Sequence, residues 1–233
     1  MIPISKDGLP PPHKNQYRPR LQEIYQDKCA YCETKINAGF APRIDHYRPQ
    51  HFYPWLIDEW SNLVLSCERC NRIKSDQFPI QGQRVNQPQM DQTEWRANSV
   101  SFLAEQAMLI HPELEDPTNH LVFHPNGTIE EKNGSKQGKE TIRICGLNRE
   151  ELIIARKKVV NRMRNELLDA LDKLTEEKSF NRTIFKKIRQ AHESHRPYSR
   201  LGWHLCEEFE RFFLAQLPEA YRPFIKKAFT HFH

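Results

Sequence analysis

No run of apolar residues in this chain approaches the length that a membrane span requires. The first residues, Met1 to Lys6, lack the apolar stretch of a secretory signal peptide. The sequence also has no internal repeat and no long linker. These absences argue against membrane, secreted and repeat architectures and predict a cytoplasmic protein.

The composition is that of a folded chain with a small excess of positive charge. Of the 233 residues, 38% are hydrophobic and 28% charged, which is enough apolar material for a packed core and argues against wholesale disorder. The length suits one domain, or a small domain with an extension. The net charge of +5 suits an anionic partner such as nucleic acid, although many proteins without such a partner share it.

Four of the six cysteines form two C-x2-C pairs, Cys29 with Cys32 and Cys67 with Cys70. In a reducing compartment, such pairs are typical of metal ligands and not of disulfides. Zinc prefers four thiolates in a closed tetrahedron, and each pair delivers two sulfurs at the required separation. The sequence therefore predicts a structural zinc site, and it predicts Cys145 and Cys206 as small buried apolar residues outside that site.

The segment between the two cysteine pairs carries the dipeptide Asp45-His46. A histidine accepts a proton near neutral pH and can activate water for attack on phosphorus, while a carboxylate is a hard ligand that suits Mg²⁺ or Mn²⁺. A zinc site on the two flanking cysteine pairs would hold the ends of this segment together. A histidine in the resulting loop is positioned at little entropic cost. The alternatives are a core or capping histidine and an aspartate in a turn or salt bridge. Neighbours on a strand point to opposite faces, so both residues can act together only where the strand bends or the ion lies at its edge.

Over roughly residues 25 to 80 the sequence reads C-x2-C, D-H-x-x-P, then N-L-x-L-x-C-x2-C-N-x-x-K. This pattern resembles the HNH endonuclease family, which has the ββα-metal fold. The resemblance implies that His46 is the general base and that Asp45 and Asn71 hold a catalytic Mg²⁺ or Mn²⁺. It also implies that the side chain of Asn62 bonds to backbone and holds the histidine loop.

Asn71 departs from the family pattern, because many members have a histidine at this position. An amide oxygen still coordinates a hard cation, so the change favours Mg²⁺ or Mn²⁺ over softer metals. The alternative is that Asn71 caps a helix, a frequent role of asparagine. The resemblance further implies phosphate contacts for Arg48 and Lys74, for which solvated surface charges are the alternative.

A wider similarity runs from about residue 25 to about residue 165 and includes Glu113-Leu-Glu-Asp-Pro-Thr-Asn-His120. These segments look like the HNH subunit of Septu-type and retron-associated anti-phage systems, in which the nuclease works with an ATPase of the ABC/SMC-like class. The resemblance implies hydrolysis of phosphodiester bonds in nucleic acid under the control of that ATPase. Two alternatives remain open: the same nuclease acting on RNA such as tRNA in a retron-linked system, or a non-catalytic zinc module that binds nucleic acid.

The expected fold class is α+β: a ββα-metal HNH module clipped by the four-cysteine zinc site and followed by an α-helical region. The expected parts are an N-terminal arm and short helix (1–28), the nuclease module (29–80), a loop-rich extension (81–147) and the helical region (148–233). The arm is expected to be extended up to residue 20. The module is expected to have strands over 43–47 and 61–66 and a helix over 70–76.

The later regions carry weaker signals. Asn126-Gly127 predicts a hairpin turn, and residues 132–139 look like an exposed loop. Asn148 predicts a helix N-cap, followed by an apolar stripe from Leu152 to Leu174. Further helices are expected over 183–192 and 201–216. The stripe needs a covering surface, which we expect from the partner ATPase or from the chain's own helices.

Overall fold

The computed structural model describes residues 10–36, 42–86, 95–172 and 196–208, together with positions 6, 190, 193, 212–214, 219 and 222–223. The chain divides into two compact units, one of residues 1–122 and 129–148 and one of residues 123–128 and 149–233. Within the described ranges, no helix combines the length and the apolar character that crossing a membrane requires.

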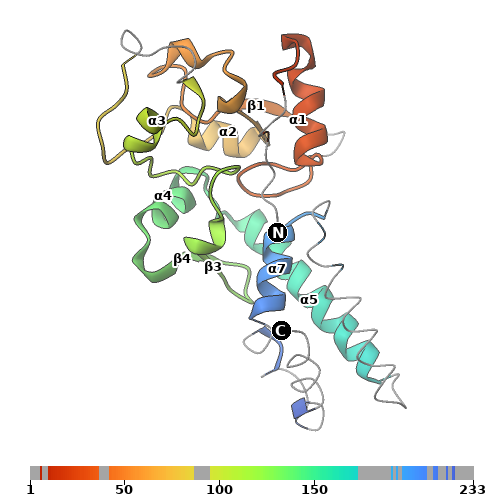
Figure 1. Cartoon of the computed structure of the whole chain (residues 1–233). Coiled ribbons are helices and arrows are strands. Elements are labelled where there is room, and N and C mark those ends of the chain that lie inside the picture. The colour runs from red at the N-terminus through yellow and green to blue at the C-terminus, as the bar shows by residue number, and fades with distance from the viewer. Residues whose placement is uncertain are drawn as a thin grey trace. The chain divides into compact units, whose positions relative to one another are not determined.

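Two short strands and a helix form the centre of the first unit (Figure 1). These elements are β1 (Arg43–His46), β2 (Leu63–Ser66) and α2 (Glu68–Lys74). The strands pair antiparallel, with Asp45 opposite Val64 and His46 opposite Leu63. Helix α2 follows β2 directly and contacts β1. The predicted α+β class with a ββα module is therefore confirmed.

Helix α2 begins two residues before the predicted start because Cys67 caps it. The Cys67 sulfur accepts a hydrogen bond from the backbone N–H of Cys70 at 3.4 Å, so a sulfur of the second cysteine pair also satisfies a free donor of the first turn. Asn71 lies inside the helix, and its interpretation as the N-cap is wrong.

The helix before the first cysteine pair is longer than predicted. Helix α1 (Tyr17–Tyr25) follows a 3₁₀ turn (Lys14–Gln16), so the arm is not extended up to residue 20. Pro19 lies in the first turn of α1, where its missing N–H costs no hydrogen bond. Leu21 and Tyr25 of α1 are buried against Trp60 and β2 and fix this helix on the strand pair.

The segment predicted as loop-rich contains two helices and a two-stranded sheet. These elements are α3 (Val100–Ala104), β3 (Leu121–Phe123), β4 (Ile129–Glu131) and α4 (Lys136–Ile144). The turn at Asn126-Gly127 is confirmed, with Gly127 in the left-handed region at φ +91°. The loop expected over 132–139 is wrong from Ser135 onward, because the hydroxyl of Ser135 accepts from the N–H of Gly138 at 3.1 Å and caps α4.

The second unit contains α5 (Glu150–Asp172) and α7 (Ser199–Glu207), which contact each other. Helix α5 begins at Glu150, so Asn148 is not its N-cap as predicted. The Asn148 side chain instead forms two hydrogen bonds with the backbone of Ile129, at 2.8 and 2.7 Å. The apolar stripe is buried at Leu152, Val160 and Met163, so the chain itself covers this part of it. The end of the stripe at Leu174, most of the helix predicted over 183–192 and the end of the one over 201–216 lie outside the described residues.

Candidate active site

The four cysteine sulfurs meet in one cluster. The sulfurs of Cys29, Cys32, Cys67 and Cys70 all lie within 4.8 Å of one another, and those of Cys32 and Cys67 are 3.8 Å apart. Ligands at the usual Zn–S distance of about 2.3 Å in a tetrahedron are separated by about 3.8 Å. The donor set therefore fits a closed structural zinc site. Of the two remaining cysteines, Cys145 is buried as predicted, and the side chain of Cys206 lies outside the described residues.

The thiols of this cluster share protons unequally. Hydrogen bonding from Cys29 lowers the pKa of Cys67 to about 7 and that of Cys32 well below its usual value. Burial raises the pKa of Cys29, and the hydrogen bond with Cys29 raises that of Cys70. Two of the four sulfurs thus become thiolates readily, and the charge of a bound metal ion favours the loss of the other two protons.

His46 is the last residue of β1, and its imidazole meets the loop that follows. Its Nε2 lies 3.0 Å from the carbonyl oxygen of Ile57, which can only accept, so this contact assigns the proton to Nε2 and makes Nδ1 the acceptor nitrogen of the ring. The Gln50 amide nitrogen lies 3.2 Å from Nδ1 and 3.0 Å from Nε2, across the ring. The half-exposed ring is thus oriented by a backbone carbonyl and by the Gln50 amide.

Asn62 closes the loop behind His46. Its Oδ1 accepts from the backbone N–H of Arg48 at 2.8 Å, and its Nδ2 donates to the carbonyl of Arg48 at 3.1 Å. The N–H of Tyr47 also donates to the Asn62 carbonyl at 2.8 Å, which extends the strand ladder by one rung. The buried amide therefore ties the chain immediately after His46 to the start of β2.

Asp45 faces α2 and the first cysteine pair. Its Oδ2 accepts from the hydroxyl of Tyr31 at 2.6 Å and lies 3.4 Å from Nζ of Lys74. Burial and the nearby Asp45 raise the pKa of Tyr31 well above its usual value, so the phenol stays protonated and donates. Among the described residues, no group donates to Oδ1 of Asp45.

Lys74 does not contact phosphate as expected, because its side chain is 0% exposed. Its ammonium group donates to the carbonyl of His46 at 2.8 Å and pairs with Asp45. A buried cation without partners is costly, and these two contacts satisfy it. Lys74 is neither a substrate contact nor a solvated surface charge, and it joins α2 to the end of β1.

Arg48 is also buried, so its expected phosphate contact is wrong. Its Nε donates to Glu105 at 2.9 Å, its Nη2 donates to the carbonyl of Phe102 at 3.1 Å, and the guanidinium stacks 4.0 Å from the Phe102 ring. The side chains of Arg48 and Glu105 are 3% and 0% exposed. This buried pair fastens the loop after His46 to the end of α3.

Lys74 follows Asn71 by three residues in α2, so the two side chains share one face of the helix. The Lys74 ammonium group on this face pairs with Asp45. The Asn71 side chain is half-buried and has no hydrogen bond among the described residues. The free oxygen of Asp45 and the amide oxygen of Asn71 are hard donors of the kind that Mg²⁺ and Mn²⁺ prefer. The donor chemistry of these two oxygens thus suits such an ion.

Three partners of the site were not predicted from the sequence. Tyr31 lies between the first two cysteines, and that position was a usable signal. Gln50 and Glu105 carry no local signal, because a single glutamine or glutamate in a loop is usually solvated.

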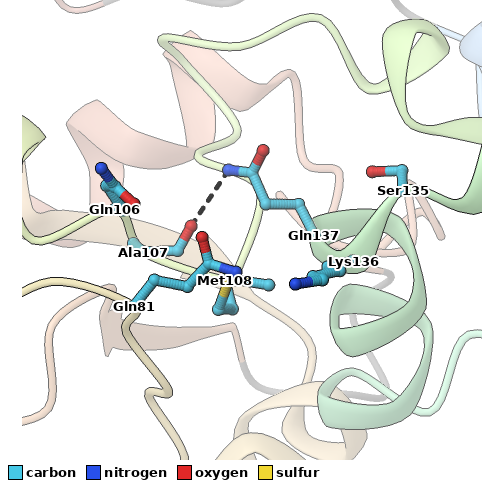
Figure 2. Close-up of a pocket in the computed structure, with 7 residues that line it drawn as sticks. All are labelled: Gln81, Gln106, Ala107, Met108, Ser135, Lys136 and Gln137. Atoms are coloured by element: carbon cyan, nitrogen blue, oxygen red, sulfur yellow. Dashed lines mark hydrogen bonds between the residues drawn. The ribbon is translucent and has the colours of Figure 1, made fainter.

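A pocket elsewhere in the first unit is lined mostly by uncharged side chains. A pocket of about 510 Å³ is lined by residues from three segments of the first unit: Gln81, Gln106, Ala107, Met108, Ser135, Lys136 and Gln137. Figure 2 shows the Gln137 amide turned toward the carbonyl of Ala107, to which it donates at 3.0 Å. No carboxylate, histidine or cysteine lines this pocket, so it does not compete with His46 as a hydrolytic centre.

A ββα frame, a four-thiolate clip and a histidine at the end of the first strand together define an HNH endonuclease domain. Residues 29–77 match the family model described as "HNH endonuclease". The chain therefore contains an HNH nuclease domain.

The chain is also similar to Septu proteins of Bacillus. It is 33% identical to Septu protein PtuB of Bacillus mycoides (strain KBAB4) over 171 residues, which cover 66% of this chain and 54% of that protein. It is 28% identical to Septu protein PtuA of the same strain over 158 residues, 62% of this chain and 21% of that protein. It is 23% identical to PtuB of Bacillus thuringiensis over 162 residues, 69% of this chain and 52% of that protein. The chain spans about half the length of the PtuB relatives that it matches.

Proposed function

We propose that this protein is a metal-dependent endonuclease that hydrolyses phosphodiester bonds in nucleic acid and acts as the nuclease effector of an anti-phage defence system. The observation that carries the proposal is the state of His46 on the HNH frame: Nε2 is held by the Ile57 carbonyl, and Nδ1 is left as the proton acceptor. The similarity to Septu proteins supports the defence role. The proposal places the protein in the cytoplasm, where cysteine thiols stay reduced.

In the proposed reaction, Nδ1 of His46 takes a proton from water as the water attacks phosphorus in line. The Ile57 carbonyl then stabilises the imidazolium, because it already accepts from Nε2–H. The Asn62 clip holds the loop so that the ring keeps this orientation. The Gln50 amide lies over the ring and has to move aside for water to reach Nδ1. The expected products carry 5′-phosphate and 3′-hydroxyl ends.

The proposed second metal is Mg²⁺ or Mn²⁺ held by Asp45 and Asn71. When bound, a divalent cation neutralises charge on the scissile phosphate and the leaving oxygen. Lys74 and Tyr31 both engage Oδ2 of Asp45, which leaves Oδ1 for the cation. The adjacent ammonium group also reduces the net negative charge of the site, so we expect weak metal binding in the absence of substrate.

Cleavage is expected to require added Mg²⁺ or Mn²⁺ even when zinc is fully bound, because four thiolates leave no open position on zinc. Asp45→Asn keeps an acceptor for Tyr31 and Lys74 and is expected to raise the metal concentration needed for half-maximal rate strongly. Asn71→Ala is expected to raise it less, since an amide carries no charge. Asn71→Asp is the matched control and is expected to lower it.

The measurement is the initial cleavage rate against Mg²⁺ concentration, with zinc content determined for each preparation. Full activity in a chelator that leaves zinc bound would rule out the second metal.

Plasmid DNA and total cellular RNA are assayed in parallel, because the HNH motif itself does not discriminate between DNA and RNA such as tRNA.

We further propose an ABC/SMC-like ATPase as the controlling partner, docked on the helical unit after Asn148. The support is the resemblance to two-component nuclease systems and the similarity to proteins named PtuA and PtuB. The apolar stripe of α5 gives this docking site less support than expected. Leu152, Val160 and Met163 are already buried within the chain and need no partner to cover them. Among the described large apolar side chains of this unit, Ile154 on α5 is the exposed one.

Ile154→Glu is therefore expected to reduce recovery of the co-expressed ATPase with tagged full-length protein, because it places a charge in the proposed contact. Val100→Glu on α3 is the matched control in the first unit, where Val100 is even more exposed, and is expected to leave recovery unchanged. Loss of the ATPase with Val100→Glu alone would move the docking surface to the first unit.

A further inference from the structure

The loop that surrounds His46 also presents an exposed aromatic side chain. Gln50 contacts the His46 ring, and His51 and Phe52 follow it directly, both exposed to solvent. The two rings lie edge to face with centroids 4.7 Å apart, and Phe52 is 37% exposed. Among the described large apolar residues of the module, Phe52 and Ile57 are the exposed ones, whereas Tyr53 next to Phe52 is buried. A phenylalanine left in solvent two residues from a contact of the general base is therefore notable.

A cation without a counter-ion lies against this ring. The Arg84 guanidinium stacks 4.2 Å from the Phe52 ring centroid and 5.2 Å from that of Tyr53. Among the described residues, Arg84 forms no salt bridge or hydrogen bond through its side chain, and its Nη1 is buried without a partner. Arg48 is also stacked on aromatic rings, but a buried glutamate pairs with it. Arg84 thus carries a charge that no described residue neutralises.

The position of Arg84 beside the loop is built into the fold. Oε1 of Glu105 accepts from the hydroxyl of Tyr53 at 2.8 Å and from the backbone N–H of Val85 at 3.0 Å. The buried carboxylate of Glu105 therefore joins Tyr53 to Val85, and these two residues directly follow Phe52 and Arg84 in the sequence. The guanidinium and the ring are held together before any ligand binds, which lowers the entropic cost of using them.

We propose that His51, Phe52 and Arg84 form a contact surface for an unpaired nucleotide next to the scissile phosphate. Phe52 stacks on the base, His51 supports the ring edge, and Arg84 binds an adjacent phosphate. The unneutralised guanidinium favours a polyanion over an apolar protein surface as the occupant. A paired base already stacks on its neighbours, so an exposed ring selects single strands, loops or extruded bases. This inference rests on the proposed function and narrows its substrate to nucleic acid with unpaired nucleotides.

The test measures binding with full-length protein carrying His46→Ala, so that cleavage does not intervene. Fluorescence anisotropy gives the Kd for labelled single-stranded DNA and RNA and for the duplex of the same sequence. Phe52→Ala is expected to weaken single-strand binding by about 10- to 100-fold, the usual effect of losing one stacked base. Phe52→Trp keeps a stacking ring and is expected to retain the affinity, whereas Phe52→Leu keeps the bulk but not the ring and is expected to behave like Phe52→Ala.

Arg84→Gln is expected to weaken binding and to reduce the slope of log affinity against log salt by about 0.7, the change for one phosphate contact on a single strand. Arg143→Gln is the matched control, because Arg143 is exposed and already pairs with Glu140 at 2.7 Å. Melting temperatures verify that each variant is folded.

Each outcome decides a different question. If the parent binds single strands and neither Phe52→Ala nor Arg84→Gln changes the Kd, the contact surface is wrong and the nuclease assignment stands. An equal loss on duplex would contradict the selection of unpaired nucleotides. If the parent binds no nucleic acid, alone or with its co-expressed partner, the proposed function fails and this inference fails with it.

Discussion

Cys70→Ser is expected to release zinc and to unfold the first unit at temperatures where the unchanged protein is folded. Cys70 is fully buried at the start of α2, and its sulfur lies in the cluster that joins both cysteine pairs. Zinc binding contributes on the order of 10–16 kcal/mol in small zinc-folded peptides, which is similar to the whole stability of an ordinary domain, about 5–15 kcal/mol. Losing even part of this contribution is enough to unfold a module with two four-residue strands.

The measurement combines zinc content per chain with a thermal melt. Cys29→Ser, in the other pair, is expected to give the same result because the tetrahedron needs all four thiolates. Cys145→Ala is the matched control: Cys145 is equally buried but outside the cluster, so zinc should remain. A Cys70→Ser protein that lacks zinc and melts like the unchanged protein would contradict the structural role.

His46→Ala is expected to lower the cleavage rate by a factor of about 10²–10⁴ and to leave zinc content and melting temperature unchanged. The imidazole is half-exposed and is neither a member of the cysteine cluster nor a partner of the Asn62 side chain, so its removal is expected to leave both in place. The loss therefore reports on proton transfer and not on folding.

His120→Ala is the control for a general effect of losing a histidine. His120 bonds the hydroxyl of Ser135 and lies outside the strand pair, so cleavage should persist. Cleavage by His46→Ala at the rate of the unchanged protein would exclude His46 as the base and would favour the non-catalytic zinc module.

The zinc cluster and the ββα order could be predicted because both depend on short-range spacing. Two residues between paired cysteines set the bite of each pair, and the segments 43–47 and 61–66 between the pairs were expected as strands, which β1 and β2 confirm. The hydrogen bonds of Asn62 to the next loop also agree with what the HNH resemblance implies.

Burial of the two basic residues could not be predicted, because it depends on distant partners. Arg48 pairs with Glu105, 57 positions later, and Lys74 reaches back 28 positions to His46. Nothing local distinguishes these side chains from surface charges. The unpredicted helix α4 has another cause: Gly138 in its first turn lowers helix propensity, and the cap at Ser135 compensates for it.

Hydrolysis of phosphodiester bonds by His46 in the HNH frame can be tested with one pair of proteins. The measurement compares the unchanged protein and His46→Ala, each co-expressed with the proposed ATPase partner, on plasmid DNA and total RNA in Mg²⁺. We expect strand breaks with the unchanged protein only, and product ends that carry 5′-phosphate and 3′-hydroxyl groups. Equal cleavage by both proteins, or product ends with 5′-hydroxyl and a 3′ or cyclic phosphate, would contradict it.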